Sequence, residues 1–269
     1  MGKFDSVLLA SDFDDTLYTK GGQVPRRSRE ALEYFISQGG RFAVATGRAH
    51  RTFAPYAHLT PMNAPAVLSN GSALYDFQAG RMLRQTFLGP EAAEDFQTIC
   101  DAFPTVGFEA YHGEDIYVFR PNWVTDAHMV KVGTQYVRCS RIQDIPQPWT
   151  KAILQQDHDL MVRVRPWVLE RFGGRYEAIF SNQVYLEITE KGSSKGGMVS
   201  YLAQLLGVRP ENLYCVGDNQ NDIPMLERSA IPFAPSNCAQ EVRDWGARVL
   251  CSCEEGVIGD IVEILEERY

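Results

Sequence analysis

Short apolar runs, each ending at a polar or glycine-containing turn, recur along the chain and predict the strands of a parallel sheet. These runs cover residues 7–10, 42–45, 67–68 and 213–216. Residues 26–38 have apolar side chains at positions 31, 32, 35 and 36, the spacing of a helix that ends at Gly39-Gly40. A second helical pattern covers residues 195–206 and stops at Gly207. Buried strands that alternate with helices predict an α/β fold with a ligand site at the carboxyl edge of the sheet.

The middle of the chain follows a different pattern, because several strand-like segments follow one another without a helix between them. A helix-like stretch over residues 94–103 precedes strand-like residues 116–119, and residues 160–164, another short helix and residues 178–180 come later. We expect residues 85–185 to form an α+β domain inserted into an α/β core made of residues 1–84 and 186–269.

Composition and charge narrow the class of protein. Of 269 residues, 45% are apolar and 22% are charged, which is ordinary for a soluble globular chain. The 26 Lys and Arg against 34 Asp and Glu give a formal net charge of −8, which disfavours nucleic acid and anionic membranes as partners. The six Cys form no C-x-x-C pair, and neither a signal peptide nor a membrane-spanning run is evident. We expect a reduced cytoplasmic protein, either a monomer or a homodimer.

An acidic cluster follows the first predicted strand. Asp12, Asp14 and Asp15 place three carboxylates within four residues, and their mutual repulsion favours a bound divalent cation. In an extended segment Asp12 and Asp14 point to the same side, so that one can attack a substrate while the other reaches the same reacting group. A solvated acidic turn is the alternative for this cluster taken alone.

A second acidic cluster, Gly217 to Asp222, follows the last of the predicted strands. Asp218 at the strand tip is a candidate ligand for a hard metal, and Asn221 and Asp222 are expected in the first turn of the next helix. Taken alone, the same residues also fit an ordinary helix N-cap with acidic neighbours.

Two further turns carry phosphate-binding features. Thr46-Gly47-Arg48 offers a hydroxyl and a free backbone N–H after a predicted strand, although Thr46 alone also fits a simple N-cap. Lys195 begins a helix, where a cation is unfavourable unless an anion or carboxylates lie nearby. Neither a G-x-x-x-x-G-K-[ST] loop nor a G-x-G-x-x-G turn is present, which disfavours P-loop nucleotide and dinucleotide binding.

In this order, the four pieces resemble the motifs of haloacid dehalogenase superfamily phosphatases. The chain is most similar to the Cof-type group (subfamily IIB), which carries a large C2B-type cap between the second and third motifs. Asp12 to Thr16 matches the first motif, Thr46 the second, Lys195 the third and Gly217 to Asp222 the fourth. Residues 69–76 resemble the Asn-Gly turn before the cap, and residues 233–242 with Gly256-Val257 resemble the C-terminal end. The chain departs from the family at Asp15, where Gly is usual.

The resemblance implies a Rossmann-like core and a Mg²⁺-dependent phosphatase that works through an aspartyl-phosphate. It implies that Asp12 is the nucleophile and Asp14 the general acid and base. Asp12, the Asp14 backbone carbonyl and Asp218 would bind the metal, and Asp222 would orient the metal shell or Lys195. The phosphate would be held by Thr46, Gly47, Lys195 and Asn221.

The expected substrate is a small phosphorylated metabolite, and the resemblance favours a sugar phosphate. Phosphatases of flavin mononucleotide or pyridoxal phosphate, a phosphomutase and a non-catalytic phosphate-binding regulator are the alternatives. The insert would act as a lid that selects the substrate together with Arg48, Asn70 and Gly71. Its candidate side chains are Tyr111, His112, Tyr117, Arg120, Trp123, Lys151, Arg163 and Arg165.

Overall fold

A computed structural model describes residues 2–269 and contains a five-stranded parallel sheet in the order β14-β13-β12-β1-β2. Its strands are β1 (Leu8–Ser11), β2 (Arg41–Val44), β12 (Leu213–Val216), β13 (Pro232–Ala234) and β14 (Arg248–Val249). Three of these strands match the predicted apolar runs to within one residue. Residues 67–68 instead lie in β3 (Ala66–Leu68), which belongs to a separate small sheet. A single parallel bridge between Val67 and Ala45 joins β3 to the residue that follows β2.

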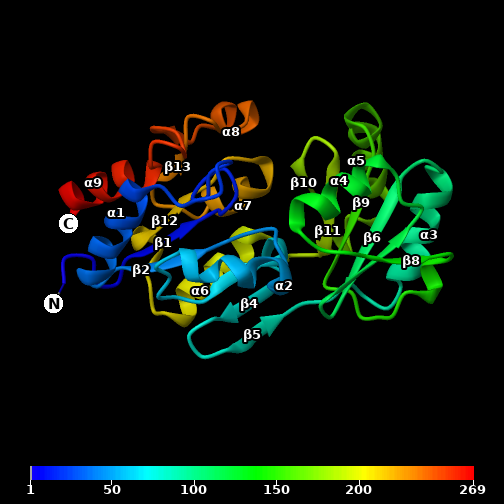
Figure 1. Cartoon of the computed structure of the whole chain (residues 1–269), viewed down its shortest axis with the longest axis horizontal. Coiled ribbons are helices and arrows are strands. Elements are labelled where there is room, and N and C mark those ends of the chain that lie inside the picture. The colour runs from blue at the N-terminus through cyan, green and yellow to red at the C-terminus, as the bar shows by residue number, and fades with distance from the viewer. Residues whose placement is uncertain (1) are drawn as a thin grey trace.

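Helices cover both faces of the parallel sheet (Figure 1). They are α1 (Arg26–Ser37), α2 (His50–Phe53), α6 (Lys195–Leu205), α7 (Ile223–Leu226), α8 (Gln240–Trp245) and α9 (Val257–Arg268). Because side chains alternate along a strand, Leu9 packs with residues of α1 and α9, whereas Leu8 and Ala10 pack with residues of α6 and α7. Hence β1 is buried on both sides, which explains its continuous apolar run.

The strand order changes direction at β1. The chain leaves β1 toward β2 on one side and returns much later to β12 on the other. Such a switch point leaves a crevice outside the carboxyl ends of the strands, because the connections run away from it on both sides. The predicted acidic clusters both follow strands that flank this point.

A small antiparallel sheet extends the core beneath the parallel one. It pairs β3 with β4 (Ala73–Asp76) and β4 with β5 (Arg81–Gln85). The turn between β3 and β4 contains Ser69 and Asn70 with positive φ values of 50° and 53°, followed by Gly71 at 98°. A Cβ on Gly71 would lie 2.1 Å from the Ser194 carbonyl oxygen, so only glycine lets this turn pack against the start of α6.

A second, six-stranded sheet lies apart from the first and has the order β10-β11-β9-β6-β7-β8 (Figure 1). Its strands are β6 (Gly107–His112), β7 (Asp115–Phe119), β8 (Val137–Cys139), β9 (Lys151–Gln155), β10 (Tyr176–Asn182) and β11 (Tyr185–Glu190). All of its pairings are antiparallel except the one between β7 and β8. The associated helices are α3 (Ala92–Ala102), α4 (Trp123–Val132) and α5 (His158–Phe172). Residues 160–164, which were expected among the strand-like segments, therefore lie within helix α5.

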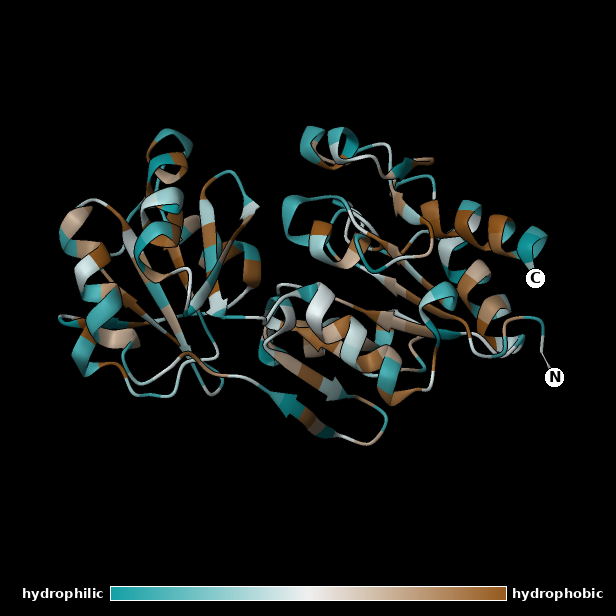
Figure 2. Cartoon of the chain, turned by 180° about the vertical axis from the view of Figure 1, so that it is seen from behind, coloured by the Kyte–Doolittle hydropathy of each residue, from teal (hydrophilic) through white to brown (hydrophobic). Residues whose placement is uncertain are grey.

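The two faces of the second sheet differ, because one of them packs against helices in the apolar interior of this unit. Leu154, Leu186 and Ile188 pack with residues of α3 and α5 in one cluster. The alternate residues Lys151 and Glu187 therefore project from the opposite face, which is turned toward the core. Figure 2 shows hydrophobic residues along the inner strands of both units and hydrophilic residues at their outer turns.

The sheets suggest where the inserted domain ends. The boundary expected after residue 185 falls at the start of β11, whose residues pair with β9 and β10 of the second sheet. We propose that the insert extends to about residue 190, with residues 2–84 and the segment from residue 191 onward forming the core. Across residues 2–269, no helix combines the length and the apolar character needed to cross a bilayer.

Candidate active site

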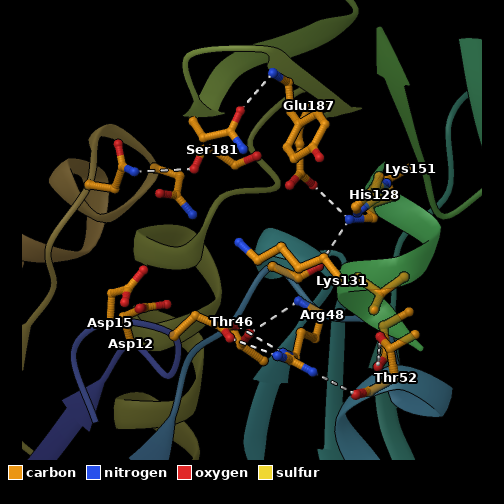
Figure 3. A pocket seen from close by; sticks show the side chains of 18 of the residues that line it. Asp12, Asp15, Thr46, Arg48, Thr52, His128, Lys131, Lys151, Ser181 and Glu187 are labelled. Carbon is orange, nitrogen blue, oxygen red and sulfur yellow. Dashed lines mark hydrogen bonds and ion pairs between the residues drawn. The ribbon is translucent and has the colours of Figure 1, made fainter. Parts of the chain in front are cut away.

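A cleft lies between the switch point of the parallel sheet and the exposed face of the second sheet (Figure 3). Residues of the core line one wall, and residues of the second unit line the other. The core contributes Asp12, Asp14, Asp15, Thr46, Gly47, Arg48, Ala49, Thr52, Asp218, Asn219 and Asn221. The second unit, called the cap below, contributes Tyr111, His128, Lys131, Val132, Lys151, Ser181, Asn182, Tyr185 and Glu187.

The deepest part of the core wall is an ion-pair network around Lys195. Its ammonium group donates to Asp12 Oδ1 at 2.5 Å and to Asp222 Oδ1 at 2.6 Å, and all three side chains are at least nine-tenths buried. Burial alone would lower the pKa of Lys195, but Asp12 and Asp222 outweigh it and raise the pKa above its ordinary value. The cation that is unusual at the start of a helix is therefore explained by two carboxylates.

Asp12 occupies an environment that disfavours its charge. Burial raises the pKa of Asp12 to about 7, and the carboxylates of Asp222 and Asp14 add to this rise while Lys195 opposes it. Burial likewise raises the pKa of Asp218, with further contributions from Asp12 and Asp222. The site thus holds more carboxylates than one lysine can neutralise.

The excess of carboxylates fits a divalent cation. Oxygen atoms of Asp12, Asp218 and Asp222 all lie within 4.8 Å of one another. Asp222 Oδ2 already accepts hydrogen bonds from the backbone N–H groups of Asp218 and Asn219, each at 3.0 Å, and so holds the loop that presents Asp218. Hard oxygen donors of this kind suit Mg²⁺.

Thr16 ends the first matched motif but was given no role from the sequence. Its hydroxyl donates to Asp218 Oδ1 at 2.9 Å and fixes that carboxylate.

Asp14 is clamped by Arg48. The guanidinium Nε donates to Asp14 Oδ2 at 2.8 Å and Nη2 donates to Oδ1 at 2.7 Å, which is a bidentate pair. Arg48 is itself fixed, because its guanidinium lies 4.6 Å from the ring centroid of Tyr56 and Nη1 donates to the Thr52 carbonyl. The structure thus gives Arg48, expected at the substrate, a direct contact with Asp14.

The turn after β2 places backbone and hydroxyl groups at the cleft. Thr46 is buried, and its hydroxyl accepts a hydrogen bond from the Arg48 N–H at 3.1 Å instead of capping α2, whose N-cap is Ala49. Asn221 also lines the cleft, and its amide donates to Asn70 Oδ1 at 3.0 Å. Asn70 and Gly71 are not among the residues that line the cleft; Asn70 holds Asn221, and Gly71 packs against the start of α6.

Asp15 takes a left-handed backbone conformation with φ of 61°. This geometry explains why glycine is usual at the position, since an L-residue there is strained. The Asp15 carbonyl accepts from the Asn237 side-chain amide at 2.7 Å, and its side chain lines the cleft. The extra carboxylate thus faces the site.

The cap wall is dominated by polar side chains, several of them missed from the sequence. Tyr111 and Lys151 are the two of the eight candidates that line the cleft, and the remaining six are outside its lining. Glu187 was missed, and so were His128, Lys131, Ser181, Asn182 and Tyr185.

Lys151 and Glu187 form a buried ion pair on this wall. Lys151 Nζ donates to Glu187 Oε2 at 2.7 Å and to the Gly47 carbonyl of the core at 2.9 Å. Burial would raise the pKa of Glu187, but the Lys151 ammonium outweighs it and lowers the pKa below its ordinary value.

Comparisons with known proteins decide the family. Residues 9–261 match the model of the haloacid dehalogenase-like hydrolases. The chain belongs to this family. It is therefore a hydrolase of this family, in agreement with the resemblance seen in its motifs.

Its relatives differ in their substrates. The 5-amino-6-(5-phospho-D-ribitylamino)uracil phosphatase YwtE of Bacillus subtilis is 25% identical, over 97% of this chain and 99% of that protein. The pyridoxal phosphate phosphatase YbhA of Escherichia coli is 25% identical, over 88% and 90%. The solved structure of a subclass IIB sugar phosphatase superposes with a TM-score of 0.82 at 18% identity, covering 96% of this chain and 98% of that one.

Proposed function

We propose that this protein is a Mg²⁺-dependent phosphatase that hydrolyses small phosphomonoesters through an aspartyl-phosphate, with sugar phosphates as its main substrates. The observation that carries the proposal is the buried Asp12 carboxylate. It lies at the switch point, paired with Lys195, in a cleft that Thr46 and Asn221 also line. Covalent catalysis divides a very slow hydrolysis into two easier steps.

In the first step an Asp12 carboxylate oxygen forms a bond to phosphorus while the bond from phosphorus to the leaving oxygen breaks. Asp14 donates a proton to that leaving oxygen, and the alcohol departs. In the second step Asp14 takes a proton from water, whose oxygen attacks phosphorus, and the bond to Asp12 breaks. Arg48 holds the Asp14 carboxylate in place for both transfers.

Charge neutralisation is divided between the chain and a metal. Asp12, Asp218 and the Asp14 backbone carbonyl would hold Mg²⁺, and Asp222 would orient Lys195 and the Asp218 loop. When bound, Mg²⁺ supplies electrostatic stabilisation of the negative charge on the phosphoryl oxygens. The Lys195 ammonium, the Thr46 hydroxyl, the Gly47 N–H and the Asn221 amide would bind the phosphate.

The named activities of the relatives support a monoester substrate. Their substrates share a phosphate group and differ in the remainder of the molecule, which is the part that a variable cap would contact. For this chain the polar cap wall favours a hydroxylated leaving group over a flat aromatic one.

The test measures inorganic phosphate released from sugar phosphates, nucleotides, flavin mononucleotide and pyridoxal phosphate, with Mg²⁺ or EDTA. We expect Mg²⁺-dependent release that Asp12→Asn abolishes. Persistence of the wild-type rate in a clean Asp12→Asn preparation would refute the covalent step. Transfer of phosphate between positions of a sugar without release would indicate a mutase, and Mg²⁺ binding with neither reaction would indicate a regulator.

A further inference from the structure

The cations around the cleft are almost all engaged by carboxylates. Arg48 pairs with Asp14, Lys195 pairs with Asp12 and Asp222, and Lys151 pairs with Glu187. Within residues 2–269, Lys131 at the end of α4 is the one lysine or arginine of the cleft lining without an ion-pair partner, and Figure 3 shows its side chain reaching into the cleft. The part of the wall formed by Lys151 and Glu187 thus offers no unpaired cation of its own to a second anionic group.

Lys151 and Glu187 occupy the part of the cleft that a leaving group must enter. In phosphoryl transfer the attacking and leaving oxygens are roughly in line, so a leaving group departs away from Asp12. Figure 3 shows Glu187 and Lys151 across the cleft from Asp12 and Thr46. Both side chains come from the cleft-facing side of adjacent strands, β9 and β11.

The pair is held firmly. The exposed fractions of the two side chains are 4% for Lys151 and 8% for Glu187. The Lys151 ammonium also lies 4.6 Å from the ring centroid of Tyr111 and donates to the Gly47 carbonyl. Because these contacts fix the ammonium, it cannot swing out to meet an anion without breaking a buried pair.

We infer that Lys151 and Glu187 are specificity-determining residues that bind neutral hydroxyl groups of the leaving alcohol and exclude leaving groups with a second negative charge. This inference rests on the proposed phosphatase function and concerns the substrate class of the same site. A carboxylate accepts hydrogen bonds from hydroxyl groups, so Glu187 can bind a hydroxyl while the Lys151 ammonium keeps the carboxylate charged and in place. A second anion would instead meet the Glu187 carboxylate in a poorly hydrated space, where like charges repel strongly.

The experiment compares matched substrates that differ in one anionic group. The pairs are fructose 6-phosphate with fructose 1,6-bisphosphate, and glycerol 3-phosphate with 3-phosphoglycerate. For the wild type we expect kcat/KM to be higher for the first member of each pair by about tenfold or more.

Two substitutions should move this ratio in opposite directions. Glu187→Gln frees the Lys151 charge and should shift the preference toward the more anionic member by about tenfold. Lys151→Gln leaves the Glu187 carboxylate unpaired and should increase the preference for the neutral member. General damage to the cap would move both variants in the same direction.

Asp95→Asn is the matched control. Asp95 is a buried cap carboxylate that accepts from Arg175 and Tyr176 and lies outside the cleft lining, so its loss should leave the ratio unchanged. An unchanged ratio in Glu187→Gln, or a wild-type preference for the bisphosphate, would overturn the inference.

A binding measurement separates this inference from the proposed function. The same pairs are titrated by calorimetry into Asp12→Asn protein in Mg²⁺, with and without Glu187→Gln. If ligands bind with the expected ratio but the wild type releases no phosphate, the inference stands and the phosphatase proposal fails. If neither member of either pair is bound or hydrolysed, the inference fails.

Discussion

The metal-free protein should lose stability as the pH rises, and the pKa shift of Asp12 gives the expected size of this loss. Folding raises the pKa of this carboxyl from an ordinary 3.8 to about 7, with burial as the largest cause. The folded chain therefore holds the Asp12 proton more tightly than the unfolded chain does. The associated stability is present while the proton is bound and is lost as the pH rises from about 4 through about 7.

At about 1.4 kcal/mol for each pH unit, the whole difference amounts to about 4 kcal/mol. Most of it, about 3 kcal/mol, falls between pH 5 and pH 8. For a chain of this length each kcal/mol moves the thermal midpoint by about 2 °C, so we expect a fall of about 6 °C.

The assay is thermal unfolding in EDTA from pH 5 to pH 8, for the wild type and for Asp12→Asn. Asn cannot titrate, so the variant should lose the part of the slope that Asp12 contributes and keep the part from Asp218, whose pKa is also raised. Added Mg²⁺ should raise the wild-type midpoint more at pH 8 than at pH 5, because protons compete with the metal for the carboxylates. Identical slopes in the two proteins would refute the assignment of this pH dependence to Asp12.

Two other substitutions test the loops around the site. Arg48→Met should lower kcat by about 100-fold with little change in KM, because Asp14 loses its bidentate partner. Arg48→Lys should lower kcat less. Steady-state kinetics measure both effects, and an unchanged kcat in Arg48→Met would contradict the prediction. Asp15→Gly should stabilise the fold by about 0.5–1 kcal/mol, because glycine accepts the left-handed backbone and keeps the carbonyl bond to Asn237. Urea unfolding measures this change, and a lower midpoint in the variant would contradict it.

The core site could be predicted because its residues follow strand ends that the apolar runs mark. Asp12 and Asp218 come directly after strands β1 and β12, which are neighbours in the sheet. Once the runs predict a parallel sheet, chain order alone places both clusters at one edge. Lys195 could be assigned to the same crevice because a cation at a helix start needs nearby negative charge.

Contacts that depend on loop geometry could not be predicted. Arg48 and Asp14 are 34 residues apart, and their pairing requires two turns of known shape. The same holds for Asn70, whose Oδ1 accepts a hydrogen bond from the Asn221 amide. Sequence places such residues near the cleft but does not give the direction of their side chains.

Most of the cap wall was missed for a different reason. Glu187 lies in the middle of strand β11, where no strand end or turn marks it, whereas Lys151, the first residue of β9, was among the candidates. Their partnership depends on the register of β9 with β11, in which Ile188 lies opposite Ala152. One signal was available, since Glu187 is a charged residue between Leu186 and Ile188 in a strand that is otherwise buried. Such a residue needs a buried partner, but the sequence offers no way to choose Lys151.

These two origins explain how one catalytic core can serve different substrates. The phosphate site is built from strand ends of the parallel sheet, whereas the leaving-group wall is built from the faces of cap strands. Among the contacts that join them, the pair of Arg51 and Asp115 is more than half exposed on both side chains and contributes little. The bond from Lys151 to the Gly47 carbonyl is buried and reaches the turn that carries Thr46. The ammonium that we assign to substrate selection therefore also holds the cap against the core, so a substitution at residue 151 should affect both selection and closure.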